Sequence, residues 1–357
     1  MATQPADLGR APPRFSRFYA ELRDPTRCIA APRFDALYLW GVPVLALLFV
    51  ELWLGLASLL PAPLELRMAG FLGVLSALLT YAHLVAVAPR AYLNQTVFRS
   101  HRLKLTVVPV LLLGALLVSP ACFVIGTVLS VFWDAHHSAM QNFGLARIYD
   151  MKAGNPPLLL RRTDMRLNWM LYIGPLAAGA SLPFHFQSFG QFQSVGWGEL
   201  AALPGVLEGR LDTITQIAVV AWLTTLAWAG FDYARAVRAG YRIPAHKLVM
   251  TASTGLVSVL AWGFSSPPVA LAAINIYHAI QYFALVWLKE GTSLQAFFGA
   301  HARRAFDLFI LFCALVAGAY ALASHLGAQW LLAPFIACSL LHFWFDGFVW
   351  SVRKQQV

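Results

Sequence analysis

Long apolar segments, repeated along the whole chain, restrict this sequence to few folds. Of its 357 residues 59% are hydrophobic and 12% are charged, and the mean hydropathy is +0.64, outside the usual range of soluble domains. A helix needs about 20 apolar residues to cross a bilayer. The segments that qualify are residues 36–60, 68–89, 104–119, 121–146, 166–182, 212–234, 246–264, 268–288, 304–325 and 329–351. The sequence therefore predicts an all-α, polytopic membrane bundle of about ten transmembrane helices.

Two pairs of predicted spans are joined so tightly that each pair resembles one long helix. The first junction is Ser119-Pro120, and the second is the Ser-Ser-Pro-Pro run at residues 265–268. Proline cannot continue a helix, because it lacks the backbone N–H and its ring clashes with the preceding turn. Both junctions are therefore predicted helix boundaries.

The distribution of basic residues predicts the orientation in the membrane, because Lys and Arg accumulate in cytoplasmic loops. With ten spans and the N-terminus inside, only Arg67 and Arg210 of the 26 Lys and Arg residues fall on the outer side. We therefore expect a multi-pass protein of a bacterial inner membrane with both termini in the cytoplasm. Topology accounts for the net charge of +10, and nucleic acid is not an expected partner, since no basic run is interleaved with aromatic residues.

The segments between the spans predict one membrane domain. Residues 1–34 hold six arginines and no apolar core, which is typical of a cytosolic segment and not of a cleavable signal peptide. Residues 35–357 would form a single transmembrane domain, whose one long outer loop, residues 183–211, is predicted to be a re-entrant or interfacial cap. The four cysteines show no CxxC or CxxCH spacing, so neither a disulfide framework nor covalent haem attachment is predicted.

Ionisable residues inside the predicted spans are the main functional signal in the sequence. Each costs on the order of 3 kcal/mol to insert, so its default interpretation is a functional one. Counting to the nearest cytoplasmic charge at about 1.5 Å per residue puts one histidine from each of spans two, four, eight and ten roughly 10–17 Å from the inner boundary. These four helices are predicted to place their imidazoles in one layer. The ionisable residues in these four spans that are singled out are His83, Asp134, His136, His137, His278, His342 and Asp346.

A shared layer of imidazoles predicts a metal site, because imidazole is the commonest nitrogen ligand for iron, zinc and copper. All seven residues are candidate ligands. His136 points about 100° away from His137 on the helix, and the choice between them stays open. A single histidine in a membrane helix is more often a packing residue or a hydrogen-bonding contact between helices. The coincidence of four at one depth is what favours a joint site.

Carboxylates and amides accompany these histidines at helical spacing. His342 and Asp346 are four residues apart, and Asn275, His278 and Gln281 form one stripe at three-residue spacing. Neighbours of this kind orient a metal ligand by holding its second nitrogen. They also supply groups that complete a metal site or position a water molecule. The candidate catalytic residues are Asp134, Gln141 and Asp346.

Aromatic side chains flank the candidate ligands. They are predicted to form the wall of a pocket for a long apolar or polyene-like substrate that enters from the bilayer. Ordinary core packing is the alternative explanation. The candidate substrate-binding residues are Trp133, Tyr277, Gln281, Phe343 and Trp344. Three other histidines, His101, His246 and His301, fall in basic cytoplasmic loops and are interpreted as solvated surface residues.

Histidines placed singly on separate membrane helices, in a ten-span chain of 357 residues, resemble the Brp/Blh-type membrane β-carotene dioxygenases, whose iron is held by histidines from different helices. The histidine-rich membrane non-haem iron desaturases and hydroxylases are a more distant likeness. The HxxxH and HxxHH boxes of that class are absent, and only DAHH at residues 134–137 offers adjacent histidines. The resemblance implies iron chemistry on a lipid-soluble substrate, and no residue role is carried over from it.

Four functions are compatible with these residues. The first is a non-haem iron oxygenase or oxidase, in which histidines alone suit one iron and carboxylate ligands favour two. Its partners would be the lipid bilayer, a lipid-soluble small molecule and a redox partner. The second is an intramembrane zinc hydrolase, whose metal activates water. The third is haem-based electron transfer, which predicts histidines at two depths, and the fourth is a proton-coupled transporter with Glu51 in a relay.

Overall fold

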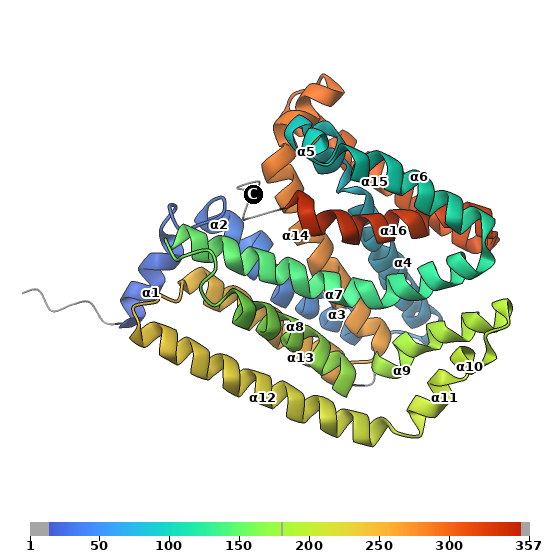
Figure 1. Ribbon diagram of the computed structural model, residues 1–357, viewed down its shortest axis with the longest axis horizontal. Helices are drawn as coiled ribbons and strands as arrows, with labels where there is room; N and C mark the ends of the chain where they lie inside the picture. Colours follow the sequence, from blue (N-terminus) through green and yellow to red (C-terminus); the bar gives the residue numbers. More distant parts are fainter. Residues whose placement is uncertain (1–13, 180, 351–357) are drawn as a thin grey trace, which may run out of the picture.

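The computed structural model describes residues 14–179 and 181–350, and every regular element in that part of the chain is helical (Figure 1). The all-α prediction is confirmed. Ten long helices make up the bundle: α3 (Val42–Ala57), α4 (Ala62–Val85), α6 (Arg102–Val118), α7 (Pro120–Lys152), α8 (Arg161–Ala178), α12 (Leu211–Arg238), α13 (Ala245–Phe264), α14 (Pro267–Phe298), α15 (Ala302–Leu326) and α16 (Gln329–Val349).

Shorter elements connect and extend these helices. Residues 1–13 of the predicted N-terminal segment lie outside the described part, and the rest of the segment includes the helix α1, which packs on α13. The π-helical turn η2 extends α4. The short elements before α7 are α1 (Arg14–Arg23), α2 (Pro32–Phe34), η1 (Asp35–Trp40), η2 (Pro89–Leu93) and α5 (Gln95–Ser100).

Both predicted proline boundaries are confirmed. α6 ends at Val118, and α7 begins at Pro120 after a bend of 117°. The Ser119 hydroxyl accepts a hydrogen bond from the backbone N–H of Cys122 at 3.2 Å, so it caps the first turn of α7. α14 likewise starts at Pro267, where the missing N–H has no cost because the first turn of a helix leaves its N–H groups unpaired.

The predicted number of ten spans is larger than the structure supports. Six helices among the described residues are long and apolar enough to cross a membrane, or up to eight segments if each bent pair counts as one span. The predicted span 166–182 corresponds to α8, whose first turns hold four charged residues, at positions 161, 162, 164 and 166. The pair α6 and α7 counts as one broken span. The chain is therefore a multi-pass membrane protein, and its orientation and compartment stay predictions.

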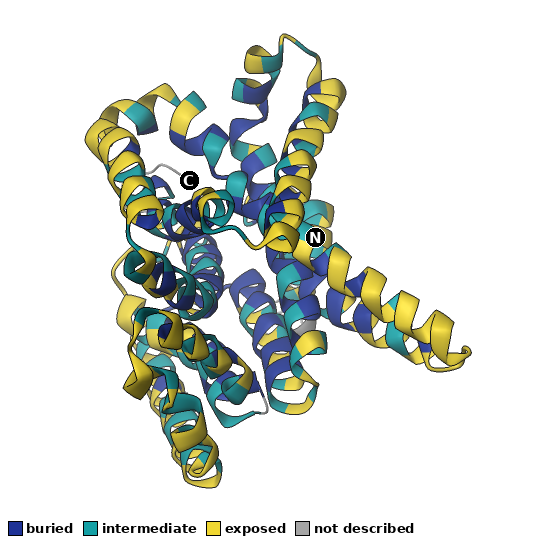
Figure 2. Ribbon diagram, turned by 90° about the vertical axis from the view of Figure 1, so that its right-hand side faces the viewer, coloured by how far each residue is buried: buried dark blue, intermediate teal, exposed yellow. Residues whose placement is uncertain are grey.

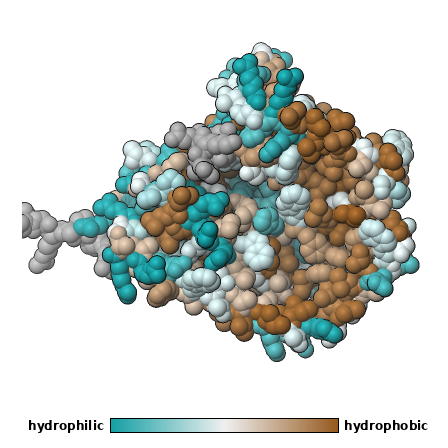
Figure 3. All heavy atoms as spheres, in the orientation of Figure 1, coloured by the Kyte–Doolittle hydropathy of each residue, from teal (hydrophilic) through white to brown (hydrophobic). Residues whose placement is uncertain are grey.

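Helix α14 is the centre of the bundle. In its most apolar window 72% of the residues are buried, whereas the value for α12 is 6%. α14 packs against α3, α4, α13 and α15, and Figure 2 shows buried residues concentrated on the facing sides of the helices. Apolar atoms gather over the right half of the face in Figure 3, and hydrophilic atoms gather at the left, around α1. An apolar exterior with a buried polar interior is what a lipid-facing bundle requires.

The long loop predicted at residues 183–211 is a chain of short helices along one side of α7. Its Phe186 and Phe189 rings pack on Phe132 of α7 with centroids 5.1 and 5.7 Å apart. Figure 1 shows the short helices of this segment at the lower right, beside one end of α7. The elements are α9 (Ser181–Phe186), η3 (Gln187–Val195), α10 (Gly198–Ala201) and α11 (Leu203–Glu208).

Four buried charges join α7, α8 and α13. Arg147 contacts Asp150 and Asp164 at 2.5 Å each, and Lys247 contacts the same two carboxylates at 2.6 and 2.8 Å. The charges balance, which is the condition under which ionised groups tolerate burial. The Tyr241 phenol donates a hydrogen bond to Asp150, and burial raises the pKa of Tyr241, so this donor keeps its proton. We call these four charged residues the buried charge cluster.

Candidate metal centre

Four helices bring one histidine each to a common point in the core. His83 of α4, His137 of α7, His278 of α14 and His342 of α16 are all buried, with exposed fractions of 4% or less. The His83 ring centroid lies 4.9 Å from that of His278 and 5.0 Å from that of His342. The His137 centroid lies 5.0 and 4.8 Å from the same two rings. The four rings, which the sequence placed in one layer, are in direct contact.

The ring nitrogens of this group are close enough to share an ion. The Nε2 atoms of His137 and His342 are 3.1 Å apart. One nitrogen from each of these two residues and one from His83 lie within 4.8 Å of one another. Metal–nitrogen bonds of about 2.0–2.1 Å place tetrahedral ligand atoms roughly 3.4 Å apart. The 3.1 Å between His137 and His342 is close to this spacing, and the whole three-residue group lies within 4.8 Å.

Several of these nitrogens have no other partner among the described residues. Both ring nitrogens of His278 and both of His83 are buried without a hydrogen bond. A buried polar atom left unpaired costs about 1–3 kcal/mol, so the unpaired nitrogens of these two neighbouring rings call for a ligand. The Nδ1–H of His342 donates to the Leu84 carbonyl at 3.0 Å, which leaves the Nε2 lone pair directed at the centre.

Asp346 supplies the carboxylate of the group. Its Oδ1 accepts hydrogen bonds from the Tyr282 hydroxyl at 2.8 Å and from the Trp350 indole at 3.1 Å. Its Oδ2 faces the centre, 3.7 Å from Nε2 of His342 and 3.8 Å from Nε2 of His137. Those distances exceed a hydrogen bond and leave room for an ion or a water molecule between the atoms.

Two glutamines lie on the other side of the histidines and bind each other. Gln141 Nε2 donates to Gln281 Oε1 at 2.9 Å, and Gln281 Nε2 donates to the Leu39 carbonyl at 2.6 Å. The pair joins α7 to α14. Gln141 was predicted to be catalytic. Its Oε1 atom is buried without a hydrogen-bond partner among the described residues, so this atom can accept a hydrogen bond from a bound molecule.

The structure separates the two adjacent histidines. His136 is exposed, and its Nδ1 accepts a hydrogen bond from the Trp169 indole of α8 at 3.2 Å. Only His137 joins the other three rings, so the predicted ligand His136 is not brought to the centre. Helix rotation is the reason, because consecutive residues on a helix point about 100° apart.

Some of the predicted substrate-binding aromatic residues pack near the histidines, and one packs elsewhere. The Phe343 ring is 4.9 Å from the His137 ring, and Trp133 packs behind it at 6.2 Å. Tyr277 is fully buried next to His278 in α14. Trp344 instead packs against Phe345 and Phe348.

Asp134 is also not placed at the nitrogens. It precedes His137 by one helical turn and lies within Coulombic range of the phenols of Tyr81, Tyr172 and Tyr277. The three residues whose ligand atoms lie within 4.8 Å of one another are His83, His137 and His342, and no hydrogen bond or ion pair among the described residues joins Asp134 to them. The structure therefore brings one predicted carboxylate, Asp346, to the histidines, and leaves the other a turn away.

A second group that could hold a metal ion was not predicted. Cys28, Asp35 and His246 are buried together near the start of the described chain, so the interpretation of His246 as a surface residue is wrong. His101, also assigned to the surface, is 9% exposed and therefore buried. No spacing signal exists for this group, because Cys28 and His246 are 218 positions apart and the cysteine occurs in no motif.

Hydrogen bonds already occupy most of this second group. Burial raises the pKa of Cys28 to about 11, so the thiol keeps its proton and contacts His246 Nε2 at 3.4 Å. Asp35 accepts from the backbone N–H groups of Ile29 and Ala30 at 2.7 and 3.0 Å, and from Tyr149 at 2.9 Å. These bonds dock the N-terminal segment, and they distinguish this group from His83 and His278, whose ring nitrogens make no hydrogen bond with the described residues.

Comparisons of the chain with protein-family models, with curated proteins and with solved structures found no match. The functional argument for this chain therefore depends on its own residues and geometry.

We predict that Asp346→Asn lowers metal affinity about 10- to 100-fold, because partners of this kind orient ligands and balance the charge of the ion. The asparagine keeps the size of the side chain and an acceptor for Tyr282. Competition with a chelator in detergent-purified protein would measure the affinity. The control is Asp307→Asn, an exposed carboxylate on α15. Equal affinities in the two variants would contradict a role for Asp346 at the centre.

Proposed function

We propose that this protein is a membrane-embedded metalloenzyme, a non-haem iron oxygenase or oxidase that acts on a lipid-soluble substrate. The observation that carries the proposal is the meeting of four buried imidazoles and one carboxylate from four helices, where the ring nitrogens of His83 and His278 have no hydrogen-bond partner among the described residues. Histidine and carboxylate ligands with open positions are typical of non-haem iron in oxygenases. When bound, such a metal supplies the redox chemistry, and the surrounding helices exclude water from it.

A single iron fits this residue set better than two. One carboxylate, Asp346, lies 3.8 and 3.7 Å from the Nε2 atoms of His137 and His342, whereas no ion pair among the described residues joins Asp134 to the histidines. Di-iron sites in helical bundles use several carboxylates that project inward together. The proposed centre is therefore mononuclear, with His83, His137, His278 and His342 as candidate ligands and Asp346 as a ligand or as the partner of a bound water molecule.

Two alternatives have less support. Haem between two imidazoles needs a flat slot for the porphyrin, and here the four rings are in contact at centroid distances of 4.8–5.0 Å. A proton relay through Glu51 would need a buried path, but Glu51 is exposed on α3 and accepts a bond from Ser265 at 3.3 Å. The resemblance to carotene-cleaving enzymes stays a proposal, supported by the placement of single histidines on separate helices.

An intramembrane zinc hydrolase is the second candidate function. It is compatible with the gap between Asp346 Oδ2 and the two nitrogens, 3.7 and 3.8 Å, which suits a carboxylate that holds a metal-bound water molecule, and the iron proposal accommodates the same gap. The two candidates predict different metals and different reactions with oxygen, so one experiment separates them.

We expect protein purified from membranes without added metal to retain iron, at about one ion per chain, and iron-loaded protein to consume oxygen when a membrane-lipid extract is supplied. Elemental analysis measures the first quantity, and an oxygen electrode measures the second. Protein loaded with zinc is the control and should consume none. Retention of zinc alone, with no oxygen uptake after iron loading, would favour the hydrolase and contradict the proposed oxygenase.

A further inference from the structure

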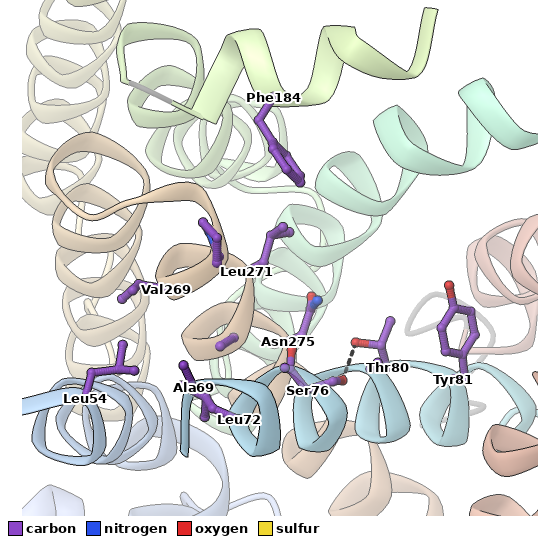
Figure 4. Close-up of a pocket in the computed structure, with 14 residues that line it drawn as sticks. Leu54, Ala69, Leu72, Ser76, Thr80, Tyr81, Phe184, Val269, Leu271 and Asn275 are labelled. Atoms are coloured by element: carbon purple, nitrogen blue, oxygen red, sulfur yellow. Dashed lines mark hydrogen bonds between the residues drawn. The ribbon is translucent and has the colours of Figure 1, made fainter. Parts of the chain in front are cut away.

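A cleft of about 370 Å³ lies between α3, α4 and α14, beneath α9 (Figure 4). Its size is in the range of about 300–1,000 Å³ that is typical of small-molecule sites. Most of the lining is aliphatic, and Phe184 of α9 points into it from above. None of its lining residues is charged at neutral pH. The polar members of the lining are Ser76, Thr80, Tyr81 and Asn275.

The inner end of the cleft adjoins the candidate metal centre. Thr80 precedes His83 by three residues in α4, and Asn275 precedes His278 by three residues in α14. Residues three apart lie on the same helix face, roughly 4.5 Å apart along the axis. Two polar lining residues therefore lie about one helical turn from two of the four imidazoles.

Asn275 differs from the other polar side chains in the lining. The Thr80 hydroxyl donates to the Ser76 carbonyl at 2.8 Å, so its donor is used within its own helix. Asn275 is half-buried, and its amide makes no hydrogen bond with the described residues. Figure 4 shows it projecting from α14 into the space toward Ser76. A carboxamide offers two donors and one acceptor, and leaving them unpaired in apolar surroundings is costly.

We propose that this cleft binds the substrate of the centre, and that the substrate is a single-chain lipid with one uncharged oxygen, such as an alcohol, aldehyde or ketone. Asn275 hydrogen-bonds that oxygen, which directs the neighbouring carbon atoms toward His83 and His278. A carboxylate or phosphate would lie unpaired in the uncharged lining. A bare hydrocarbon would leave Asn275 unpaired. This inference rests on the function proposed above and narrows its substrate class.

The chain offers a matched pair of glycines with which to block the cleft. Gly73 lines the cleft, and a Cβ atom added there would meet nothing within 4 Å. Gly70, one turn earlier in the same helix, is equally unobstructed and is not part of the lining. Gly73→Leu therefore fills the cleft, whereas Gly70→Leu adds the same side chain outside it.

The binding test uses a long-chain alcohol that carries a photoreactive diazirine, with the purified full-length protein. We expect light-induced labelling at residues 76–81 and 269–275, mapped by mass spectrometry. Gly73→Leu should remove most of this labelling, and Gly70→Leu should retain it. Labelling that is confined to other segments, or that is the same in both variants, would overturn the proposal.

The substrate-class test uses three probes: an alcohol and an alkane on Asn275→Leu, a substitution that keeps the side-chain size, and a fatty acid on the unsubstituted protein. Its apparent affinity for the alcohol should fall roughly tenfold, which is about 1.4 kcal/mol for one lost hydrogen bond. Its affinity for the diazirine alkane without the hydroxyl should stay unchanged. An equal loss for both probes would overturn the role of Asn275. Tight binding of the matching fatty acid by the unsubstituted protein would overturn the restriction to uncharged lipids.

Metal analysis of the same samples separates this inference from the proposed function. A chain that retains its metal and is not labelled in the cleft would overturn the inference alone. A chain that is labelled in the cleft and retains no metal would overturn the proposed function, together with the assignment of the bound lipid as a substrate.

Discussion

His342→Ala is expected to abolish metal retention, and this is the largest effect that we predict at the centre. The His342 ring is held by the hydrogen bond from its Nδ1–H to the Leu84 carbonyl, and its Nε2 atom lies 3.1 Å from the His137 Nε2 atom, so the substitution removes the best-oriented ligand atom. Elemental analysis after dialysis against a weak chelator should show metal in the unsubstituted protein and almost none in the variant. His137→Ala should behave in the same way.

The matched control is His136→Ala, which removes an imidazole next in sequence to a proposed ligand. His136 is exposed and bonded to Trp169, so its loss should leave the metal content unchanged. The elution profile in detergent shows whether each variant stays folded. Equal metal content in the His136 and His342 variants would exclude the centre, because one residue lies within the cluster of rings and the other outside it.

Lys247→Met is expected to destabilise the protein strongly. Lys247 lies between Asp150 and Asp164, and its removal leaves the two carboxylates with one cation, Arg147. Breaking a buried ion pair costs about 3–5 kcal/mol, because the remaining charge loses its partner without regaining water. The temperature at which the detergent-purified protein unfolds should fall sharply.

Two further variants test that explanation. Arg238→Met removes an exposed charge from α12 and should leave the unfolding temperature nearly unchanged. The double variant Lys247→Met with Asp164→Asn should be more stable than Lys247→Met alone, since it restores a balanced charge in the cluster. If the second substitution lowered stability further, packing of the lysine stem would be the cause, and the electrostatic explanation would be wrong.

The sequence located the four histidines because helix geometry is regular. A fixed rise per residue converts sequence distance into depth, so His83, His137, His278 and His342 could be assigned to one layer before any packing was known. The ends of α6 and α13 could also be predicted, because a proline interrupts a helix through its own ring and its missing N–H. Rotation about the helix axis is not local, since it depends on the neighbouring helices, and the choice between His136 and His137 therefore required the structure.

Contacts between residues far apart in the chain could not be predicted from the sequence. Arg147 and Lys247 were assigned to cytoplasmic loops because charge near a span end is normally solvated, and the two carboxylates that neutralise them come from α7 and α8. The number of spans was overestimated for a related reason. An 18-residue helix with four charges, such as α8, is stable here because its polar side pairs with other helices, and hydropathy alone does not predict such pairing.

The position of His342 on the last described helix has a consequence for biogenesis. Its partner His137 is 205 residues earlier in the chain, and His83 is earlier still. During translation the first three imidazoles leave the ribosome long before the fourth, so a nascent chain cannot assemble the full set until α16 has been released and inserted. Loading of the ion would then be a final maturation step, and a truncated product would be distinguishable to the cell by its failure to acquire it.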